Sequence, residues 1–403
     1  MMRNGMKVRN VLGVLLLAAA LLLAAVGCSG GTANTPKSGA SASGAASASA
    51  KSATEPPTID GLTFERAMDL TYADKFAVFY YNDGFKVLRV TNDVDYLIIP
   101  EGAQAPAKLP KGMVKLQQPL DSIYLCATAT ASLFNAIDSL DAVKFTGTDA
   151  KGWSIESMRD AVDAGTIKYA GKYSAPDYET LVSSGCDMAL ESTMILHAPE
   201  VKEAIEKLDI PVFIEHSSAE SEPMGRVEWA KAFGALLNKE DVAEKYFDEQ
   251  VKVIGEMADF KPTGKTVAFF SVNSTGQVVV RRPGDYISKS IEIAGGSYAF
   301  PNLDDSGSLS TLKMSMEEFY KTAVKVDYLV YNGTIETPLS SINDLIQLDA
   351  TFADYKAVKE GNVYTCDKDM YQATDKIASM IHDFHILVSG GDEQGLVFLT
   401  KVS

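Results

Sequence analysis

The feature that most constrains the fold of this chain is a repeated alternation of short apolar strands and amphipathic helices. Between residues 123 and 214, apolar segments such as 143–147 and 212–214 are separated by loops and helical patterns. The same alternation resumes at residue 266, after a long helical stretch. Strands that alternate with helices form βαβ units around a parallel sheet, so the chain is predicted to be an α/β protein. We expect two doubly wound α/β lobes joined by a helical connector.

Turn and capping signals locate the individual elements. Pro176 marks one helix start, Gly185 one helix end, and a capping box begins at Ser315. The expected helices cover residues 131–140, 176–184, 199–208, 226 to about 258 with an interruption at 238–240, 286–294, and 375 to about 388. The expected strands cover residues 123–127, 143–147, 167–170, 187–190, 212–214, 266–272, 277–281, 328–332 and 362–364.

Residues 58–110 have a different pattern. They contain alternating and aromatic-rich stretches at 77–81, 87–90 and 96–99. Asn82-Asp83-Gly84 lies between the first two stretches, and Asp-Gly pairs favour tight hairpin turns. We therefore expect an N-terminal β elaboration on the first lobe.

The N-terminus has the pattern of a lipoprotein signal peptide. Three basic residues precede an apolar run at 11–26, which as a helix spans roughly 24 Å and is short for a hydrocarbon core of about 30 Å. The run ends in Ala25-Val26-Gly27-Cys28, which resembles a bacterial lipobox. The predictions are a signal peptide at 1–28, lipidation at Cys28, and anchoring on the outer face of the cell membrane (the periplasmic side in a host with two membranes). The alternative is an ordinary secretory signal with a chance cysteine.

A flexible tether is predicted after the signal peptide. Residues 29–57 are mostly Ser, Ala, Gly, Thr and Pro, and they contain no Leu, Val, Ile or aromatic residue. Such a segment cannot bury a hydrophobic core. We expect the N-terminal lobe with its β elaboration at 58–225, the connector at 226–260 and the C-terminal lobe at 261–403.

Charge and metal-ligand content exclude several classes of protein. Without residues 1–28 the chain has 34 basic and 53 acidic residues, a net charge of −19, so the basic surface of a nucleic-acid-binding protein is absent. Beyond Cys28, three widely spaced cysteines remain, which indicate neither a disulfide framework nor a zinc motif. His382 and His385 can share a helix face, but the chain has only four histidines and a metal site needs three or four converging ligands. We expect a monomer without a bound metal or cofactor.

Several stretches carry a family resemblance that covers roughly residues 123–371. They are Tyr169-Ala170-Gly171-Lys172-Tyr173 with Pro176-Asp177-Tyr178-Glu179, Cys186-Asp187-Met188-Ala189-Leu190, Leu208-Asp209-Ile210-Pro211-Val212, Phe233-Gly234-Ala235-Leu236-Leu237-Asn238-Lys239-Glu240, Pro283-Gly284-Asp285-Tyr286 with Ile293-Ala294-Gly295-Gly296, and Val358-Lys359-Glu360-Gly361-Asn362-Val363-Tyr364. In this order they resemble motifs of the iron-chelate and vitamin B12 class of ABC-importer binding proteins. The segment before Ile123 has no clear counterpart in the shorter family members.

The resemblance implies a rigid helical link, a modest closure on ligand, and docking of each lobe onto a permease subunit through a glutamate. Glu179 matches the N-lobe position. The matching C-lobe position is Lys289, and Glu292 is the nearest acidic substitute. Glu179 has an alternative role, because a first-turn glutamate complements the helix dipole.

The expected ligand site follows from the sheet rule that ligands bind outside the carboxyl ends of parallel strands. Tyrosine offers a flat surface with a hydroxyl, and arginine can hold an anionic chelate or carboxylate with two hydrogen bonds. Adjacent strand residues face opposite ways, so one of the two neighbouring arginines is expected to face the cleft. The candidate ligand-binding residues are Thr128, Thr130, Lys172, Tyr173, Ser192, Thr193, Arg281, Arg282, Tyr286 and Tyr371.

The predicted function is capture of a small metal chelate and delivery to an ABC permease and its ATPase. A ferric siderophore is the first expectation, with haem or a corrinoid as alternatives, and the arginine pair favours an anionic chelate. No nucleophile elbow with a plausible acid partner and no Gly-x-Gly-x-x-Gly loop after a strand stands out, so we expect no enzyme activity. The alternative function is a surface lipoprotein enzyme or sensor on the same scaffold. Neighbouring genes for a permease and an ATPase would favour transport.

Overall fold

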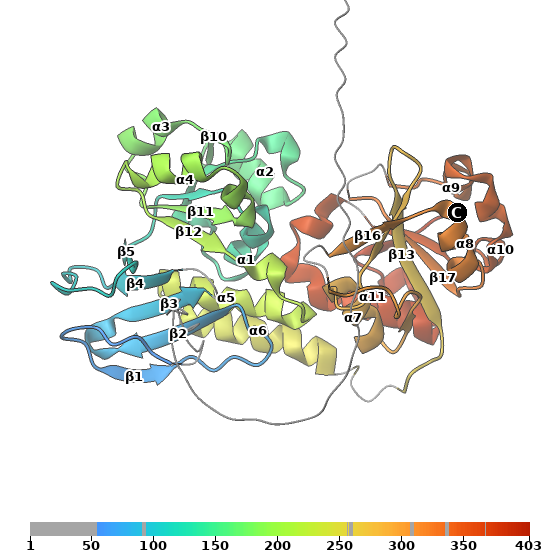
Figure 1. The fold of residues 1–403 in the computed structure, drawn as a ribbon, viewed down its shortest axis with the longest axis horizontal. Helices are drawn as coiled ribbons and strands as arrows, with labels where there is room; N and C mark the ends of the chain where they lie inside the picture. Colours follow the sequence, from blue (N-terminus) through green and yellow to red (C-terminus); the bar gives the residue numbers. More distant parts are fainter. Residues whose placement is uncertain are drawn as a thin grey trace, which may run out of the picture. The chain divides into compact units, whose positions relative to one another are not determined.

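Three sheets of five or more strands, a two-stranded sheet and the helices packed around them make up most of the described part of the chain (Figure 1). This computed structural model describes residues 55–90, 94–255, 257, 261–306, 310–334, 338–366 and 368–403. They belong to one unit, Ala50–Ser403. The predicted signal peptide, Cys28 and most of the tether lie outside the described residues. No described helix has both the length and the hydrophobicity needed to cross a membrane.

The predicted N-terminal β elaboration is a five-stranded sheet. Its strands lie in chain order and are β1 (Phe64–Ala67), β2 (Phe76–Tyr81), β3 (Lys86–Val90), β4 (Asp95–Ile99) and β5 (Val114–Gln117). All neighbouring pairs are antiparallel except β4 and β5. The hairpin turn predicted at Asn82-Asp83-Gly84 is confirmed, and Asp83 and Gly84 both have positive φ angles, of 58° and 79°.

The N-lobe contains a wholly parallel sheet in the order β12-β11-β6-β7-β8. Helices cover both faces, because residues of α1 and α2 pack with one set of strand residues and residues of α3 and α4 pack with the other. The strands are β6 (Ile123–Leu125), β7 (Val143–Thr146), β8 (Lys168–Tyr169), β11 (Met188–Ser192) and β12 (Val212–Glu215). The helices are α1 (Ala131–Ala136), α2 (Glu156–Asp163), α3 (Tyr178–Ser183) and α4 (Pro199–Glu206).

Two predicted helix bounds in the N-lobe are wrong. Pro176 does not begin a helix. It lies in β10 (Ala175–Pro176), which pairs with β9 (Gly171–Lys172), and α3 starts after Asp177, whose side chain caps it by accepting from the Thr180 N–H at 3.1 Å. Helix α1 ends at Ala136 instead of residue 140, because Asp138 has a φ of 51° and turns the chain.

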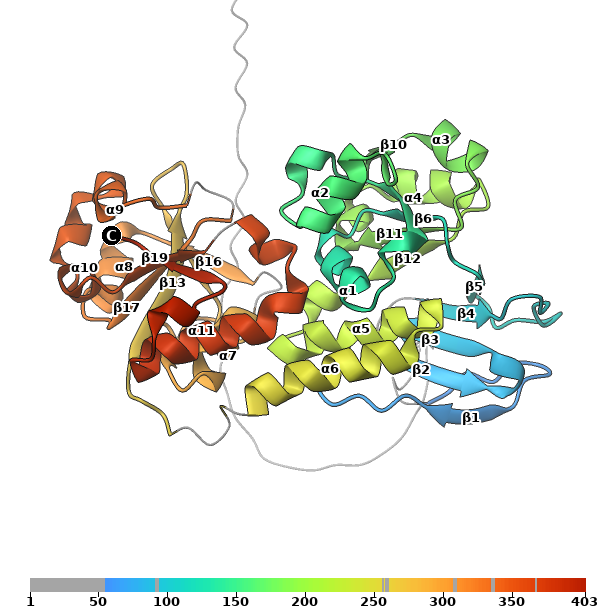
Figure 2. The same ribbon diagram turned by 180° about the vertical axis from the view of Figure 1, so that it is seen from behind.

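The predicted long helix is a pair of antiparallel neighbours, α5 (Pro223–Leu237) and α6 (Glu240–Gly255). The predicted interruption is confirmed at Asn238, which has a left-handed φ of 56°. The two helices approach closely at Gly234, where an added Cβ would lie 2.8 Å from the Cβ of Ala243. Helix α5 packs against the N-terminal sheet and α1, and α6 contacts α11 of the C-lobe (Figure 2).

The C-lobe contains a mixed sheet in the order β16-β14-β13-β17-β18-β19, with β15 also paired to β13. Strands β13, β17 and β18 are parallel, and β14, β16 and β19 are antiparallel additions at the edges. The strands are β13 (Thr266–Val272), β14 (Val278–Arg281), β15 (Ser297–Tyr298), β16 (Thr311–Met314), β17 (Tyr328–Asn332), β18 (Val363–Cys366) and β19 (Leu399–Lys401). The helices are α7 (Tyr286–Ile293), α8 (Met316–Ala323), α9 (Ile342–Leu348), α10 (Lys356–Glu360) and α11 (Ile377–Ser389).

The predicted fold class is confirmed. Each lobe is an α/β layer structure, and the helical pair lies between them in the chain. The capping box predicted at Ser315 is present, with both of its reciprocal bonds to Glu318. The domain boundaries at 225 and 260 stay predictions.

Candidate ligand-binding site

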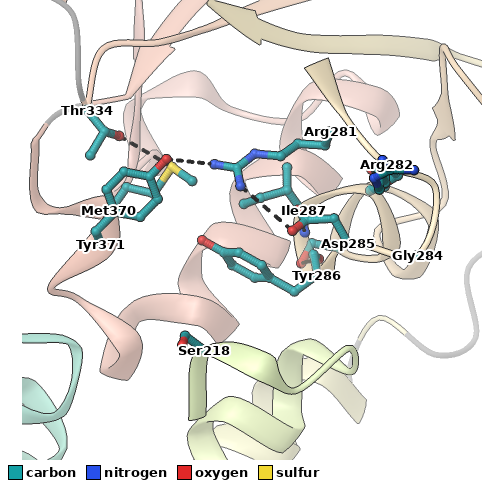
Figure 3. Close-up of polar contacts among 12 residues, drawn as sticks. Ser218, Arg281, Arg282, Gly284, Asp285, Tyr286, Ile287, Thr334, Met370 and Tyr371 are labelled. Atoms are coloured by element: carbon teal, nitrogen blue, oxygen red, sulfur yellow. Dashed lines mark hydrogen bonds and ion pairs between the residues drawn. The ribbon is translucent and has the colours of Figure 1, made fainter. Parts of the chain in front are cut away.

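A buried guanidinium lies behind an exposed tyrosine in the C-lobe. Arg281, the last residue of β14, is 4% exposed, and its Nη2 donates to the hydroxyl of Tyr371 at 3.1 Å (Figure 3). Tyr371 ends the 3₁₀ turn Lys368–Tyr371 and is 39% exposed. A carboxylate oxygen of Asp285 lies 3.7 Å from Arg281 Nη1. The buried guanidinium of Arg281 is therefore joined by a hydrogen bond to a phenol that is exposed at the surface of the C-lobe.

The electrostatics of this pair keep Arg281 charged. Burial lowers the pKa of Arg281, but the neighbouring Asp285, Tyr371 and Tyr286 outweigh that effect and raise it. Burial raises the pKa of Asp285, and the guanidinium groups of Arg281 and Arg226 act against this rise. Asp285 also caps α7, because its carboxylate accepts from the Ile287 N–H at 3.0 Å. One carboxylate thus positions both the arginine and the helix.

A second arginine reaches the same region from α5. The Cζ of Arg226 lies 3.7 Å from the ring centroid of Tyr286, the first residue of α7. Arg226 donates to the carbonyls of Ser218 at 2.6 Å and Glu220 at 3.2 Å, and no described carboxylate forms an ion pair with it. Burial lowers the pKa of Arg226. The guanidinium of Arg226 is held by two carbonyls and the face of an aromatic ring. Its positive charge has no direct contact with a described carboxylate.

The third arginine faces a cavity. Arg282 is 8% exposed, bonds to the carbonyl of Asp304, and has a buried Nε without a hydrogen-bond partner among the described residues. Figure 3 shows Arg281 and Arg282 on opposite sides of Asp285, as expected from the alternation of strand residues. The cavity measures about 490 Å³ and lies between α5 with the turn before it and the start of α7. Its lining includes Tyr286, the basic residues Arg226, Arg282 and Lys289, and the acidic residues Glu220, Asp285 and Asp305.

A second cavity of about 600 Å³ lies between α1 and α2 of the N-lobe and residues 369–376 of the C-lobe. It is polar and contains more acidic than basic side chains. Asp369 and Asp375 each have one buried oxygen without a hydrogen-bond partner among the described residues, and burial raises the pKa of Asp375. This acidic lining makes the second cavity a poorer site for an anion than the arginine-lined one.

Comparison with known proteins identifies the family. A family model described as a periplasmic binding protein matches residues 127–370. The chain belongs to this periplasmic binding protein family.

Sequence relatives of this periplasmic binding protein include two uncharacterized lipoproteins of Methanocaldococcus jannaschii. One is 25% identical over 313 residues, covering 74% of this chain and 70% of the relative. The other is 26% identical over 345 residues, covering 80% of this chain and 84% of the relative.

Solved structures with a similar fold include the periplasmic heme binding protein HutB of Vibrio cholerae and the petrobactin-binding protein YclQ of Bacillus subtilis. The first is 15% identical, with a TM-score of 0.53, and the match covers 66% of this chain and 98% of that one. The second is 16% identical, with a TM-score of 0.53, and covers 66% of this chain and 92% of that one. These likenesses show a shared fold, and the family model is what makes the chain a periplasmic solute-binding protein.

The structure brings some of the predicted ligand-binding residues together. Arg281, Tyr286 and Tyr371 form one cluster, and Arg282 lines the cavity beside it. Thr128 and Thr130 form a 3₁₀ turn that contacts the turn Ser217–Ala219, the source of one carbonyl bound by Arg226. These residues come from the carboxyl-end loops of β6 and β12 and from the C-lobe.

Other predicted ligand-binding residues have local structural roles. The Thr130 hydroxyl is buried and donates to the Ala127 carbonyl at 2.7 Å. Ser192 caps the 3₁₀ turn that contains Thr193 by accepting from the Met194 N–H. Lys172 is exposed in β9, and Tyr173 is half-buried against the N-lobe core. None of these residues contacts the arginine cluster in the described part of the chain.

Arg226 was not predicted from the sequence. It lies inside a helix, so the rule that selects loops after strands does not find it. One signal in the sequence could have identified Arg226. A positive charge near the start of a helix is repelled by the positive end of the helix dipole, so an arginine at this position indicates a further stabilising interaction. Stacking on Tyr286 supplies that interaction.

The predicted permease contacts are accessible. Glu179 lies exposed in the first turn of α3, and Glu292 lies exposed near the end of α7. Lys289 forms an ion pair with Glu222 at 2.6 Å, so it is committed to a contact within this protein. Cys126, Cys186 and Cys366 are free thiols, and no described group of three or more His, Cys, Asp or Glu side chains could hold a metal ion.

Proposed function

We propose that this protein captures a metal–organic chelate, with an anionic ferric siderophore as the first candidate and haem or a corrinoid as alternatives, and delivers it to the permease and ATPase of an ABC importer. The observation that carries the proposal is the convergence of Arg226, Arg281 and Arg282 around Tyr286. The chain as a whole has a formal net charge of −16, so three arginines in one buried region need a local explanation.

The chemistry of the cluster supports an anionic ligand. Arginine keeps its charge when buried and presents several donors in a fixed plane, which matches carboxylate or catecholate oxygens. Tyr286 and Tyr371 add aromatic surface beside these donors. Arg281 is paired with Asp285, and Arg282 lies 3.5 Å from the exposed carboxylate of Asp304. Among the described residues, Arg226 has no carboxylate ion pair, so it is the arginine of the cluster that an anionic ligand could neutralise.

A binding measurement tests the ligand class. We expect an anionic ferric tris-catecholate to raise the melting temperature more than cyanocobalamin does at the same concentration, because stabilisation of the folded state grows with the logarithm of the ligand's affinity. Haem is the third ligand in the comparison. Unchanged melting temperatures with all three ligands would contradict the ligand class.

Substitution of Arg226 by methionine tests the cluster itself. Arg226→Met keeps a side chain over Tyr286 but removes the charge, and we expect the affinity for the tris-catecholate to fall by roughly 10- to 100-fold. Arg66→Met is the matched control, because the Arg66 Cζ also lies 3.7 Å from a tyrosine centroid, that of Tyr80 in the N-terminal sheet. Equal affinity of the Arg226 variant and wild type in isothermal titration would exclude the cluster as the binding site.

A further inference from the structure

The side chain of Gln372 bridges the two lobes. Its Oε1 accepts from the Ser154 N–H at 2.8 Å, and its Nε2 donates to the Gly152 carbonyl at 2.7 Å. Gln372 follows β18 in the C-lobe, and the two backbone groups lie between β7 and α2 in the N-lobe. A carboxamide that uses its acceptor and a donor on one short stretch of backbone fixes the relative position of both segments.

Residues after Gln372 continue the contact with the N-lobe. The Thr374 hydroxyl donates to the Ala129 carbonyl at 2.8 Å. The Asp375 N–H donates to the Ser132 hydroxyl at 3.3 Å. Segment 372–375 thus forms a row of interlobe hydrogen bonds along one wall of the 600 Å³ cavity.

Residues before Gln372 belong to the candidate ligand site. Tyr371 accepts the hydrogen bond from Arg281, and Met370 is contacted by the Thr334 hydroxyl at 3.5 Å (Figure 3). Tyr371 and Gln372 are adjacent in the chain. A ligand bound against Arg281 and Tyr371 therefore lies next to the segment that Gln372 fixes to the N-lobe.

We propose that Gln372 is an interlobe latch, which stabilises the closed arrangement of the lobes and couples it to the occupancy of the Arg281 site. The coupling to ligand rests on the proposed function, whereas the latch itself does not. By linkage, a contact that stabilises the closed state raises the affinity of any ligand that prefers this state. Loss of the latch opens the lobes more often and speeds ligand release.

Hydrogen exchange of the Ser154 amide tests the latch without ligand. In the full-length protein in detergent, we expect Gln372→Ala to raise the exchange rate of this amide about tenfold, because its hydrogen bond is lost and the lobes separate more often. Gln372→Glu keeps an acceptor for Ser154 but loses the donor to Gly152, so its exchange rate should be intermediate. Gln347→Ala, at an exposed position of α9, is the control.

Ligand release supplies the second measurement. We expect release of the tris-catecholate to be about fivefold or more faster from Gln372→Ala than from wild type or the control. Unchanged Ser154 exchange in both Gln372 variants would overturn the latch, and faster exchange with unchanged release would overturn its coupling to the site. If no chelate binds wild type, the proposed function fails while the exchange measurement still decides the latch. If Gln372→Ala does not fold, Gln372→Glu gives the same two readouts.

Discussion

At the scale of single residues, the most unusual group outside the ligand site is the carboxyl of Glu191 in β11. Its side chain is fully buried, and neither oxygen has a hydrogen-bond partner among the described residues. Burial raises its pKa to about 8, and the nearby Cys126 thiol acts in the opposite direction. The folded protein therefore holds a proton on Glu191 near neutral pH.

Because Glu191 is protonated in the folded state, we predict that the stability of the folded protein falls with rising pH. The pKa of an unfolded glutamate is 4.5, so between this value and about pH 8 the folded state binds a proton that the unfolded state has released. We expect the free energy of unfolding to fall over this range in wild type and to fall less in Glu191→Gln, with a difference of about 1–3 kcal/mol at pH 9. Urea unfolding at pH 5, 7 and 9 measures it. Parallel pH profiles for the two proteins would contradict this account.

The site could be predicted from sequence only in part. The sheet rule selects Arg281, Arg282, Tyr286 and Tyr371 because each lies near a strand end, and the structure places them around one helix start. The same rule also selects Thr130, whose hydroxyl is committed to its own turn. Whether such a residue faces the ligand site depends on the direction of its side chain and on its hydrogen bonds to the backbone. The periodicity of the sequence gives no information about either.

At the scale of elements, strands with strong local signals were predicted well and strands that depend on tertiary partners were missed. Strands β13 and β17 have the predicted bounds, because each is a continuous run of apolar and β-branched or aromatic residues. Strand β19 was missed although the apolar run Leu396-Val397-Phe398-Leu399 leads into it, and it pairs with β18 at the edge of the sheet. It is held by Asp383 of α11, a fully buried carboxylate that accepts the N–H groups of Val397, Phe398 and Leu399.

We predict that Asp383 stabilises the C-terminal strand β19. Asp383→Ala leaves these backbone donors without their acceptor, and we expect a loss of about 3 kcal/mol in the free energy of unfolding together with faster amide exchange at residues 397–399. Asp392→Ala is the control, because Asp392 is exposed and, among the described residues, accepts a hydrogen bond from the Gln394 N–H alone. Slow exchange at 397–399 in the Asp383 variant would show that β19 is held by other contacts.

At the scale of the whole molecule, the proposed ligand site and the proposed permease contacts lie on different surfaces. The arginine cluster is buried between the lobes, whereas Glu179 and Glu292 are exposed on helices. A charge reversal at either glutamate removes an attraction to a basic partner and replaces it with repulsion. Docking can therefore be changed without a change in binding.

Transport measurements test this separation. We expect Glu179→Arg and Glu292→Arg each to lower chelate uptake by cells about tenfold or more, with an unchanged dissociation constant for the purified protein. Glu317→Arg is the control, because Glu317 is also an exposed first-turn glutamate, in α8. Normal uptake by both variants would exclude these residues as permease contacts.

The packing of α5 has a practical consequence for dissecting this protein. Almost every side chain from Pro223 to Leu236 is buried, and Lys86 of the N-terminal sheet donates to the Ala235 carbonyl at 3.0 Å and to Asn238 at 2.8 Å. Trp229 and Phe233 belong to the same hydrophobic cluster as that sheet. An expression fragment that stops before residue 223 lacks α5, so the apolar face of the N-terminal sheet that α5 covers would be exposed to water. We expect such a fragment to aggregate, and a soluble N-terminal fragment must therefore extend through α6.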